Sequence, residues 1–322
     1  MGKKKIILIV LISVLLTGFI ALMISLDKIF AVYSPSTRAV NLAKTHSLVY
    51  FDNKPYRAKK TTNYILVGID SEGPLVSSKS YTNTDLNDFI CILSFDHSTK
   101  TFFLLPINRD TMCYVDEYGL TGRVISSSYR QIAYAHTEGD GLKKSFQNTL
   151  NSASKLLFDL DIERFAGFTM SAIPIVNEYI GNVDITLDED LSEIDPSWTK
   201  GATIVLTKDN CMQYIRARQE VGDGTNISRM NRQKVYINRV IEKVKEGSYN
   251  IREAMTLIDD YTCSNMVNGD YLDLRSWLND YTYAGTYQIE GTATSNNGLI
   301  EFVVDEEKLK DLVKNLFYDP IE

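Results

Sequence analysis

The sequence predicts a mixed α/β domain that follows an N-terminal membrane anchor. Short apolar runs of strand length occur together with longer segments of helical periodicity, and a mostly apolar run occupies residues 6–26. The chain has 322 residues, of which 44% are hydrophobic and 23% charged, an ordinary globular composition. Because no internal repeat or long low-complexity linker interrupts the remainder, we expect a single domain after the anchor.

The N-terminal segment has the pattern of a membrane-spanning helix. Lysines at positions 3–5 precede the apolar run 6–26, whose length is close to the ~20 residues that a span needs. A cleaved signal peptide is the alternative, but its apolar core is normally ~7–15 residues, and no clear cleavage site follows. We therefore expect an uncleaved, single-pass anchor over residues 1–27. The positive-inside rule keeps the lysines in the cytoplasm and places the rest of the chain outside.

Three strands are expected at the start of the domain, after a polar and basic stalk over residues 28–60. The runs NYILVGID (63–70), DFICILSF (88–95) and TFFLLPIN (101–108) are apolar and of strand length. The segment DHSTK between the last two has the length of a hairpin connection. A polar loop, 71–87, joins the first strand to the second.

The remaining elements are mainly helices. Helical patterns are found at about 141–158, 170–180, 207–216, 229–246, 251–260 and 305–317, and strand patterns at 182–187 and 299–304. The helix at 170–180 is expected to stop at Gly181. The tyrosine-rich segment 276–291 is expected to form a core or rim strand, with a glycan surface as the alternative.

Charged side chains mark the predicted strand ends. Asp70 ends the first strand, Asp88 opens the second, and Arg109 and Asp110 follow the third. Ligands of open α/β sheets gather at strand ends. Two converging carboxylates could hold Mg²⁺ beside a phosphorylated substrate, because this ion keeps phosphate oxygens and waters in its shell. Turn or capping aspartates, and a purely structural Arg–Asp pair, remain the alternative.

Two clusters rich in arginine lie close together in the second half of the chain. They contain Arg216, Arg218, Arg229, Arg232 and Gln233. The formal net charge of the chain is −7, so this positive charge is local. Closely spaced guanidinium groups suit a phosphate or a pyrophosphate. Pairing with the neighbouring carboxylates of Glu220 and Asp223 is the alternative.

The second cluster is expected at the start of a helix. Ser228 is the predicted N-cap, which would place Arg229 and Arg232 in the first turn, where a bound anion is favoured. At ~100° per residue, Arg229 lies within roughly 20° of Val240, a member of the apolar stripe. The arginine face should therefore turn toward the body of the protein.

The first cluster sets a condition on the helix that precedes it. Arg216 and Arg218 would lie about 200° apart on a continuous helix, so they could not face one ligand. In extended backbone, residues i and i+2 share a face. We therefore expect the helix at 207–216 to end near Arg216.

Cysteines, histidines and overall charge exclude several classes of function. The four cysteines, Cys91, Cys113, Cys211 and Cys263, contain no C-x-x-C pair, so a zinc cluster is not expected. Outside the cell they could form disulfides, although Cys91 in its apolar run is better explained as a core residue. The three histidines are too scattered for a metal site or a nucleophilic triad, and only His136 lies near polar candidates. Without its three N-terminal lysines the chain carries about −10 (−7 minus 3), so nucleic-acid binding is not expected.

Several of these segments, taken in order from about Asn63 to about Ile241, resemble the LytR-CpsA-Psr family of bacterial cell envelopes. VGID at 67–70 resembles the family's strand with G-x-D, LNDF at 86–89 its R-S-D-T, INRDT at 107–111 its IPRDT, QIAYAHTEGDG at 131–141 its N-A-A-Y-x-x-G-G, YIRAR at 214–218 its Y-x-R-x-R, and NISRMNRQ at 226–233 its D-x-G-R-x-x-R-Q. Two positions depart from the pattern. Leu86 stands where the family usually has arginine and Asn226 where it usually has aspartate, which could shift the substrate or mark a member with little activity.

The resemblance implies a fold and an activity. The fold is a central mixed β-sheet flanked by helices, with an apolar pocket for a lipid tail. The family-like catalytic region would span 61–250, with 251–322 in the same ectodomain. The activity is a Mg²⁺-dependent phosphotransferase that moves a glycopolymer, such as teichoic acid or capsule polysaccharide, from a polyprenyl-pyrophosphate carrier to a peptidoglycan acceptor. A non-catalytic binder or regulator of lipid-linked glycans, and a pyrophosphatase that uses water, are the alternatives.

The resemblance also implies roles for the residues already singled out. Asp70 and Asp88 would hold the metal. The pyrophosphate would contact Arg109, Arg216, Arg218, Arg229, Arg232 and Gln233. Arg109 and Arg218 would also take part in catalysis. Asp110 is a candidate base for the attacking hydroxyl, and Asp223 is another.

Overall fold

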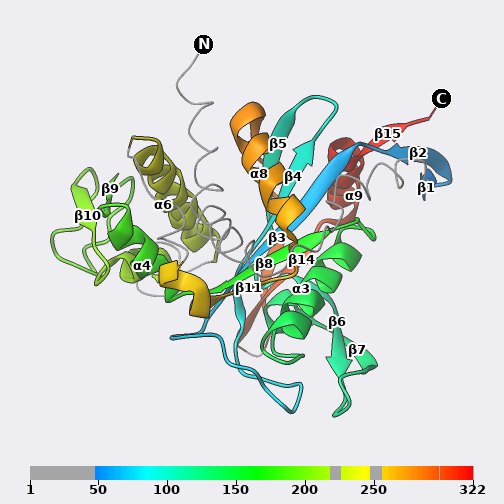
Figure 1. Ribbon diagram of the computed structural model, residues 1–322, viewed down its shortest axis with the longest axis horizontal. Coiled ribbons are helices and arrows are strands. Elements are labelled where there is room, and N and C mark those ends of the chain that lie inside the picture. The colour runs from blue at the N-terminus through cyan, green and yellow to red at the C-terminus, as the bar shows by residue number, and fades with distance from the viewer. Residues whose placement is uncertain (1–47, 218–225, 247–255, 297, 322) are drawn as a thin grey trace.

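A six-stranded mixed sheet forms the centre of the computed structural model, which describes residues 48–217, 226–246, 256–296 and 298–321 (Figure 1). Its strand order is β11–β8–β3–β4–β5–β12. In that order the strands are Thr262–Ser264, Arg164–Thr169, Thr61–Ile69, Asn87–Asp96, Thr101–Pro106 and Thr282–Thr286. β4 pairs antiparallel with both β3 and β5, whereas β8 is parallel to β3 and β12 is parallel to β5.

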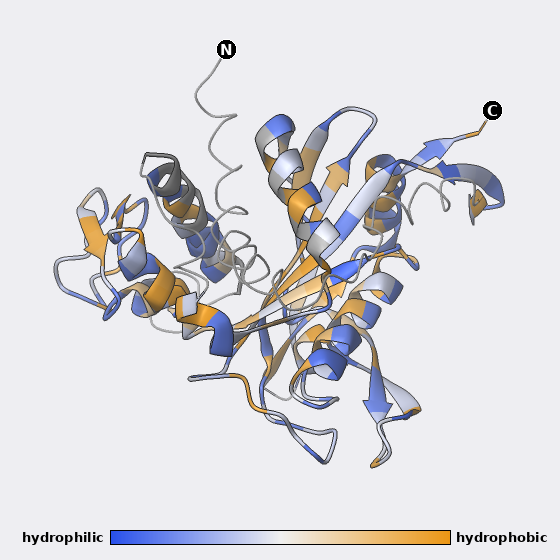
Figure 2. Ribbon diagram, viewed as in Figure 1, coloured by the Kyte–Doolittle hydropathy of each residue, from blue (hydrophilic) through white to orange (hydrophobic). Residues whose placement is uncertain are grey.

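The central strands are apolar on both faces, which explains their nearly continuous hydrophobic sequences. Along β3, Tyr64 and Leu66 contribute to one buried cluster, whereas Ile65 and Val67 contribute to the cluster on the opposite face. Figure 2 shows hydrophobic residues concentrated in these strands and on the helices beside them.

Helices cover both faces of the sheet, so the domain has three layers (Figure 1). One cluster packs the sheet against α4 (Ala172–Tyr179), α5 (Cys211–Arg216), α6 (Asn226–Glu246) and α8 (Asn268–Asp280). The other packs it against α3 (Lys143–Leu156) and α9 (Glu306–Phe317). Helices α5 and α6 therefore lie on the same side of the sheet.

Smaller strand pairs surround this core. Three antiparallel hairpins are formed by β6 (Met112–Tyr118) with β7 (Val124–Gln131), β9 (Val183–Thr186) with β10 (Thr203–Leu206), and β13 (Gly291–Asn296) with β14 (Leu299–Val304). A separate small sheet contains β1 (Leu48–Phe51), β2 (Lys54–Ala58) and β15 (Tyr318–Pro320). Two 3₁₀ helices, η2 (Ile132–Ala135) and η3 (Asp259–Tyr261), complete the described elements.

Most of the expected elements are found. The first three strands, the hairpin between β4 and β5, the helices at 141–158, 170–180, 207–216, 229–246 and 305–317, and the strands at 182–187 and 299–304 are confirmed within a few residues. The tyrosine-rich segment 276–291 is a strand only in part: residues 276–280 belong to α8, and β12 forms a rim strand at one edge of the central sheet. The expected helix at 251–260 lies partly outside the described residues.

The segment before residue 61 differs from the expectation of a stalk. Residues 48–58 form β1 and β2, and Phe51 is buried against the rings of Phe158 and Tyr318. The C-terminal β15 pairs with β2, so both ends of the described chain are tied to the domain. The predicted anchor over residues 1–27 lies outside the described residues. None of the helices that the structure describes is long and apolar enough to cross a membrane.

Candidate active site

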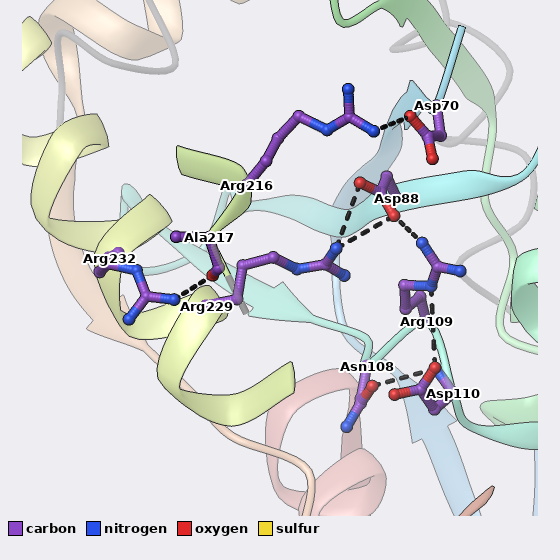
Figure 3. A network of polar contacts seen from close by, with 9 residues as sticks. All are labelled: Asp70, Asp88, Asn108, Arg109, Asp110, Arg216, Ala217, Arg229 and Arg232. Carbon is purple, nitrogen blue, oxygen red and sulfur yellow. Dashed lines mark hydrogen bonds and ion pairs between the residues drawn. The ribbon is translucent and has the colours of Figure 1, made fainter. Parts of the chain in front are cut away.

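The candidate site is formed where β3 ends and β4 begins (Figure 3). The Asp70 amide donates to the Leu86 carbonyl at 2.7 Å, and Ile69 is the register partner of Asn87. This pairing brings Asp70 and Asp88 together at the same end of two neighbouring central strands, although a long loop separates them in the sequence. The expected convergence of the two strand ends is therefore confirmed.

Two arginines from different elements bind the carboxylate of Asp88. Arg109, which follows β5, donates to Asp88 Oδ1, and Arg229 Nη1 on α6 lies 3.2 Å from both Asp88 oxygens. Asp88 and Arg229 are each 4% exposed, so this ion pair is shielded from water. Buried ionic groups of this kind require partners, and here the three charged side chains come from three separate segments.

Asp110 lies beside Arg109 and is also buried. Its Oδ1 is 3.7 Å from Arg109 Nε, and its amide donates to Asn108 Oδ1 at 3.0 Å. The Asp110 carbonyl accepts from the Phe302 amide at 2.8 Å, which fixes the loop against β14. The loop after β5 is thus held from both sides while Arg109 extends to Asp88 (Figure 3).

Arg216 binds the second carboxylate on the more open side of the site. Its Nη2 is 2.5 Å from Asp70 Oδ1, and the two side chains are 37% and 33% exposed. Helix α5 ends at Arg216, and the following Ala217 has φ −48° and ψ 131°, which is extended backbone. The prediction that this helix ends near Arg216 is confirmed. Arg218, Glu220 and Asp223 lie outside the described residues.

Arg232 and Gln233 are buried, but Arg232 is bound elsewhere. It is 1% exposed, donates to the Ala217 carbonyl, and lies 2.8 Å from Glu189 Oε1. Figure 3 shows its guanidinium beside Ala217, whereas that of Arg229 extends to Asp88. The inward orientation of this helix face, expected from the position of Val240, is confirmed.

The predicted cap of this helix is wrong. α6 begins at Asn226, so Ser228 is its third residue and not its N-cap. Arg229 is therefore in the second half of the first turn, and Arg232 belongs to the second turn. The side chain of Arg229 binds Asp88 and that of Arg232 binds Glu189 and Ala217, and neither position is set by a serine cap.

The charges at the site suit an incoming phosphorylated ligand. Carboxylates are the present partners of three arginines at the site, Arg109, Arg216 and Arg229. A pyrophosphate can replace them, since guanidinium groups bind carboxylates and phosphates in the same forked geometry. Among the described residues, no group of three or more His, Cys, Asp or Glu side chains could hold a metal. The site itself contains two carboxylates, Asp70 and Asp88, which bind arginines here; Mg²⁺ beside substrate phosphates is commonly held by one or two carboxylates.

Two further side chains at the site were not predicted from the sequence. Glu189, in the loop after β9, is the partner of Arg232, and Asp85 lies in the loop before β4. Burial raises the pKa of Asp85, a hydrogen bond from Ser71 opposes this, and the negative charge of Asp70 raises the pKa further. Both positions lie in segments with several acidic residues, so the sequence contains no signal that selects them.

His136 and the cysteines have structural positions. His136 is fully buried, its Nδ1 lies 3.1 Å from the Asp85 carbonyl, and burial lowers its pKa to about 4. It is therefore neutral at physiological pH and supports the loop that precedes β4. All four cysteines are unpaired, and Cys91 is a core residue as expected.

Comparison with known proteins agrees with this geometry. Residues 29–317 match the LytR_cpsA_psr family over most of the chain. The chain belongs to the LytR_cpsA_psr family. The resemblance of the chain to this family is therefore confirmed. The Leu86 backbone still holds Asp70, but its side chain supplies no cation to the site.

Individual members of the LytR_cpsA_psr family and of its fold share limited sequence identity with this chain. Polyisoprenyl-teichoic acid–peptidoglycan teichoic acid transferase TagU of Bacillus subtilis (strain 168) is 24% identical over 235 residues, which is 71% of this chain and 71% of TagU. The solved structure of B. subtilis TagT has a TM-score of 0.57 at 19% identity, and covers 89% of this chain and 97% of TagT. Protein gbs0355 from Streptococcus agalactiae has a TM-score of 0.62 at 16% identity, with 79% of this chain and 87% of that chain covered. The two structures show that the fold is shared.

Proposed function

We propose that this protein transfers a glycopolymer from a polyprenyl-pyrophosphate carrier to a hydroxyl group of peptidoglycan. The observation that carries the proposal is the convergence of Arg109, Arg229 and Arg216 on two carboxylates at the ends of the central strands β3 and β4. Membership of the LytR_cpsA_psr family supports it, and so does the relative TagU, a teichoic acid transferase. The polymer would accordingly be of the teichoic acid or capsule polysaccharide class.

The arginines would bind the pyrophosphate of the donor. Arg109 and Arg229 are held in the interior, whereas Arg216 lies on the open side, so the ligand would be bound by guanidinium groups from both directions. Phosphoryl transfer requires mainly positioning and stabilisation of charge, and fixed arginines supply both. Arg218 belongs to the same motif and is proposed to contribute as well.

The reaction exchanges the phosphoanhydride bond of the donor for a phosphoester bond to the acceptor. The oxygen of the acceptor hydroxyl forms a bond to the phosphorus that carries the glycan, and the bond from this phosphorus to the bridging oxygen breaks. Polyprenyl phosphate leaves with the electron pair, and its charge is stabilised by the arginines. The hydroxyl proton passes to a base, for which Asp110, beside Arg109, is the candidate within the described site.

Asp70 and Asp88 would hold Mg²⁺ in the donor complex. When bound, this ion would supply positive charge to the pyrophosphate oxygens. The ion would bind carboxylates that already bind arginines, and the pyrophosphate would give those arginines a further anionic partner. No charged group of the site would then be left without a partner.

The proposed location follows from the N-terminal sequence. An anchor over residues 1–27 with its lysines in the cytoplasm would hold the domain outside the membrane, where lipid-linked polymers and peptidoglycan meet. The protein would thus be a single-pass membrane protein with its C-terminal domain outside the cytoplasm.

The test is release of polyprenyl phosphate by the full-length protein in detergent micelles. A polyprenyl-pyrophosphate glycan labelled in its lipid would be incubated with peptidoglycan, with Mg²⁺ or with EDTA. We expect labelled polyprenyl phosphate to be released only with Mg²⁺, while the glycan, without its labelled lipid, becomes attached to the peptidoglycan. Asp88→Ala and Arg229→Ala should lose turnover. Arg57→Ala, an exposed arginine on β2, is the matched control and should retain activity.

The products distinguish the alternatives. Release that does not depend on peptidoglycan, with free glycan phosphate as product, would identify a pyrophosphatase. Donor binding without release, in the presence of Mg²⁺, would identify a non-catalytic binder and contradict the proposal.

A further inference from the structure

We propose that Arg232 is a positioning residue, which fixes the end of α5 and thereby Arg216, and that it does not contact the pyrophosphate. This inference rests on the proposed function, because it concerns the same binding site. The motif that contains Arg229 and Arg232 suggests equal roles for the two arginines. The structure gives them different partners.

Arg232 satisfies a carbonyl that lies beyond the end of a helix. α5 ends at Arg216, and the backbone turns into an extended conformation at Ala217. Carbonyl groups at helix ends have no partner within the helix, and arginine side chains can bind them. Arg232 Nη2 donates to the Ala217 carbonyl, next to the residue that binds Asp70.

Glu189 holds the guanidinium of Arg232 in this position. Its Oε1 is 2.8 Å from Arg232 Nη1, and the Glu189 side chain is 30% exposed. Arg232 therefore links three segments, namely α6, the end of α5 and the loop after β9. Rotation of this guanidinium toward a pyrophosphate would leave the Ala217 carbonyl without this donor, which is costly for a buried group.

The two possible roles of Arg232 predict opposite effects of removing Glu189. If Arg232 contacted the pyrophosphate, Glu189→Ala would remove a competing anion and would strengthen binding or leave it unchanged. If Arg232 positions α5, the same change loosens the guanidinium that holds Ala217, and binding becomes weaker. The direction in which Glu189→Ala changes the affinity for the pyrophosphate therefore decides between the two roles of Arg232.

The experiment measures binding of geranylgeranyl pyrophosphate with Mg²⁺ to the full-length protein by titration calorimetry. For Arg232→Ala we expect a dissociation constant about tenfold higher, a typical effect for coupled polar contacts. Glu189→Ala should also raise the dissociation constant, and the double variant should bind the probe no more weakly than Arg232→Ala alone. Glu189→Gln keeps an acceptor and should restore part of the affinity.

A second comparison tests whether Arg232 acts through Arg216. In the Arg216→Ala background, Arg232→Ala should cause a clearly smaller loss of affinity than in the unmodified protein, since non-additivity is the mark of coupled residues. Additive losses, or tighter binding by Glu189→Ala, would overturn the inference. Should Arg232→Ala fail to fold, the partly exposed Glu189 position still supplies the decisive measurement.

The same titration separates this inference from the proposed function. Arg229→Ala, which removes a proposed direct contact, must weaken binding of the pyrophosphate probe. If the unmodified protein does not bind the probe, the proposed function fails. If it binds, and Glu189→Ala binds equally well or better, only the role of Arg232 is wrong.

Discussion

Arg229 Nη1 on α6 lies 3.2 Å from both carboxylate oxygens of Asp88 on β4, and the two residues are 141 positions apart in the sequence. The same carboxylate accepts from Arg109. One aspartate at the start of a central strand thus joins that strand to a helix and to a loop. Because this ion pair is buried, its loss should affect both stability and binding.

Removal of the carboxylate should destabilise the fold strongly. Asp88→Ala leaves two largely buried guanidinium groups without this partner, and we expect the free energy of unfolding to fall by about 3–5 kcal/mol. Urea denaturation of the purified protein measures the change. Arg57→Ala on exposed β2 should stay within about 0.5 kcal/mol of the unmodified protein. Equal stability of Asp88→Ala and Arg57→Ala would contradict the buried ion pair.

The pair of Arg216 with Asp70 should behave differently. Both side chains are about one-third exposed, so solvent screens the pair, and Asp70→Ala should change the free energy of unfolding by less than about 1 kcal/mol. The proposed function nevertheless requires loss of polyprenyl phosphate release. Parallel denaturation and turnover measurements check this separation. Full activity of a well-folded Asp70→Ala protein would exclude Asp70 from the site.

Gly167 in β8 should not tolerate a side chain. A Cβ atom at this position would lie 2.2 Å from Cε1 of Phe146, which is buried and stacked on Phe165. Overpacking of a core typically costs about 1–3 kcal/mol, and a clash this close should reach at least the upper part of that range in Gly167→Ala. Thermal denaturation measures the loss. Phe146→Leu in the same chain should recover part of it, and the absence of any recovery would place the strain elsewhere.

His136 should make stability depend on pH in a defined window. Burial lowers its pKa from 6.5 to about 4, so between these pH values the unfolded chain binds a proton that the folded chain does not. The free energy of unfolding should therefore fall as the pH drops from 6.5 to 4, by about 3 kcal/mol from this residue. Urea denaturation at several pH values measures the slope. His136→Gln should show a smaller slope in this window, and an unchanged slope would contradict the prediction.

The central strands could be predicted where their apolar character is continuous. β3, β4 and β5 are buried on both faces, so their sequences are uniformly hydrophobic and easy to recognise. β8 was missed because its sequence, RFAGFT, contains an arginine and a glycine. The glycine is required by the approach of Phe146 from α3, which is a tertiary contact.

The hairpin of β6 and β7 was missed for a different reason. Its strands contain acidic residues and three serines, and β7 is largely exposed, so neither has a strong hydrophobic pattern. Its position is set by packing of Cys113 and Val115 into the core beside α3, and this partner is remote in the sequence.

The sequence by itself determined the three apolar strands β3, β4 and β5, most of the helices, the family motifs and the types of charged residue at the site. These properties are local, because apolar periodicity and strand-end residues can be recognised without knowing their partners. Only the tertiary structure decided which carboxylate each arginine binds. Arg229 and Arg232 are three residues apart on one helix, yet one binds Asp88 while the other binds Glu189 and Ala217. The physical reason is that a side chain pairs with whichever segments the fold packs beside it, and those segments are far away in the sequence.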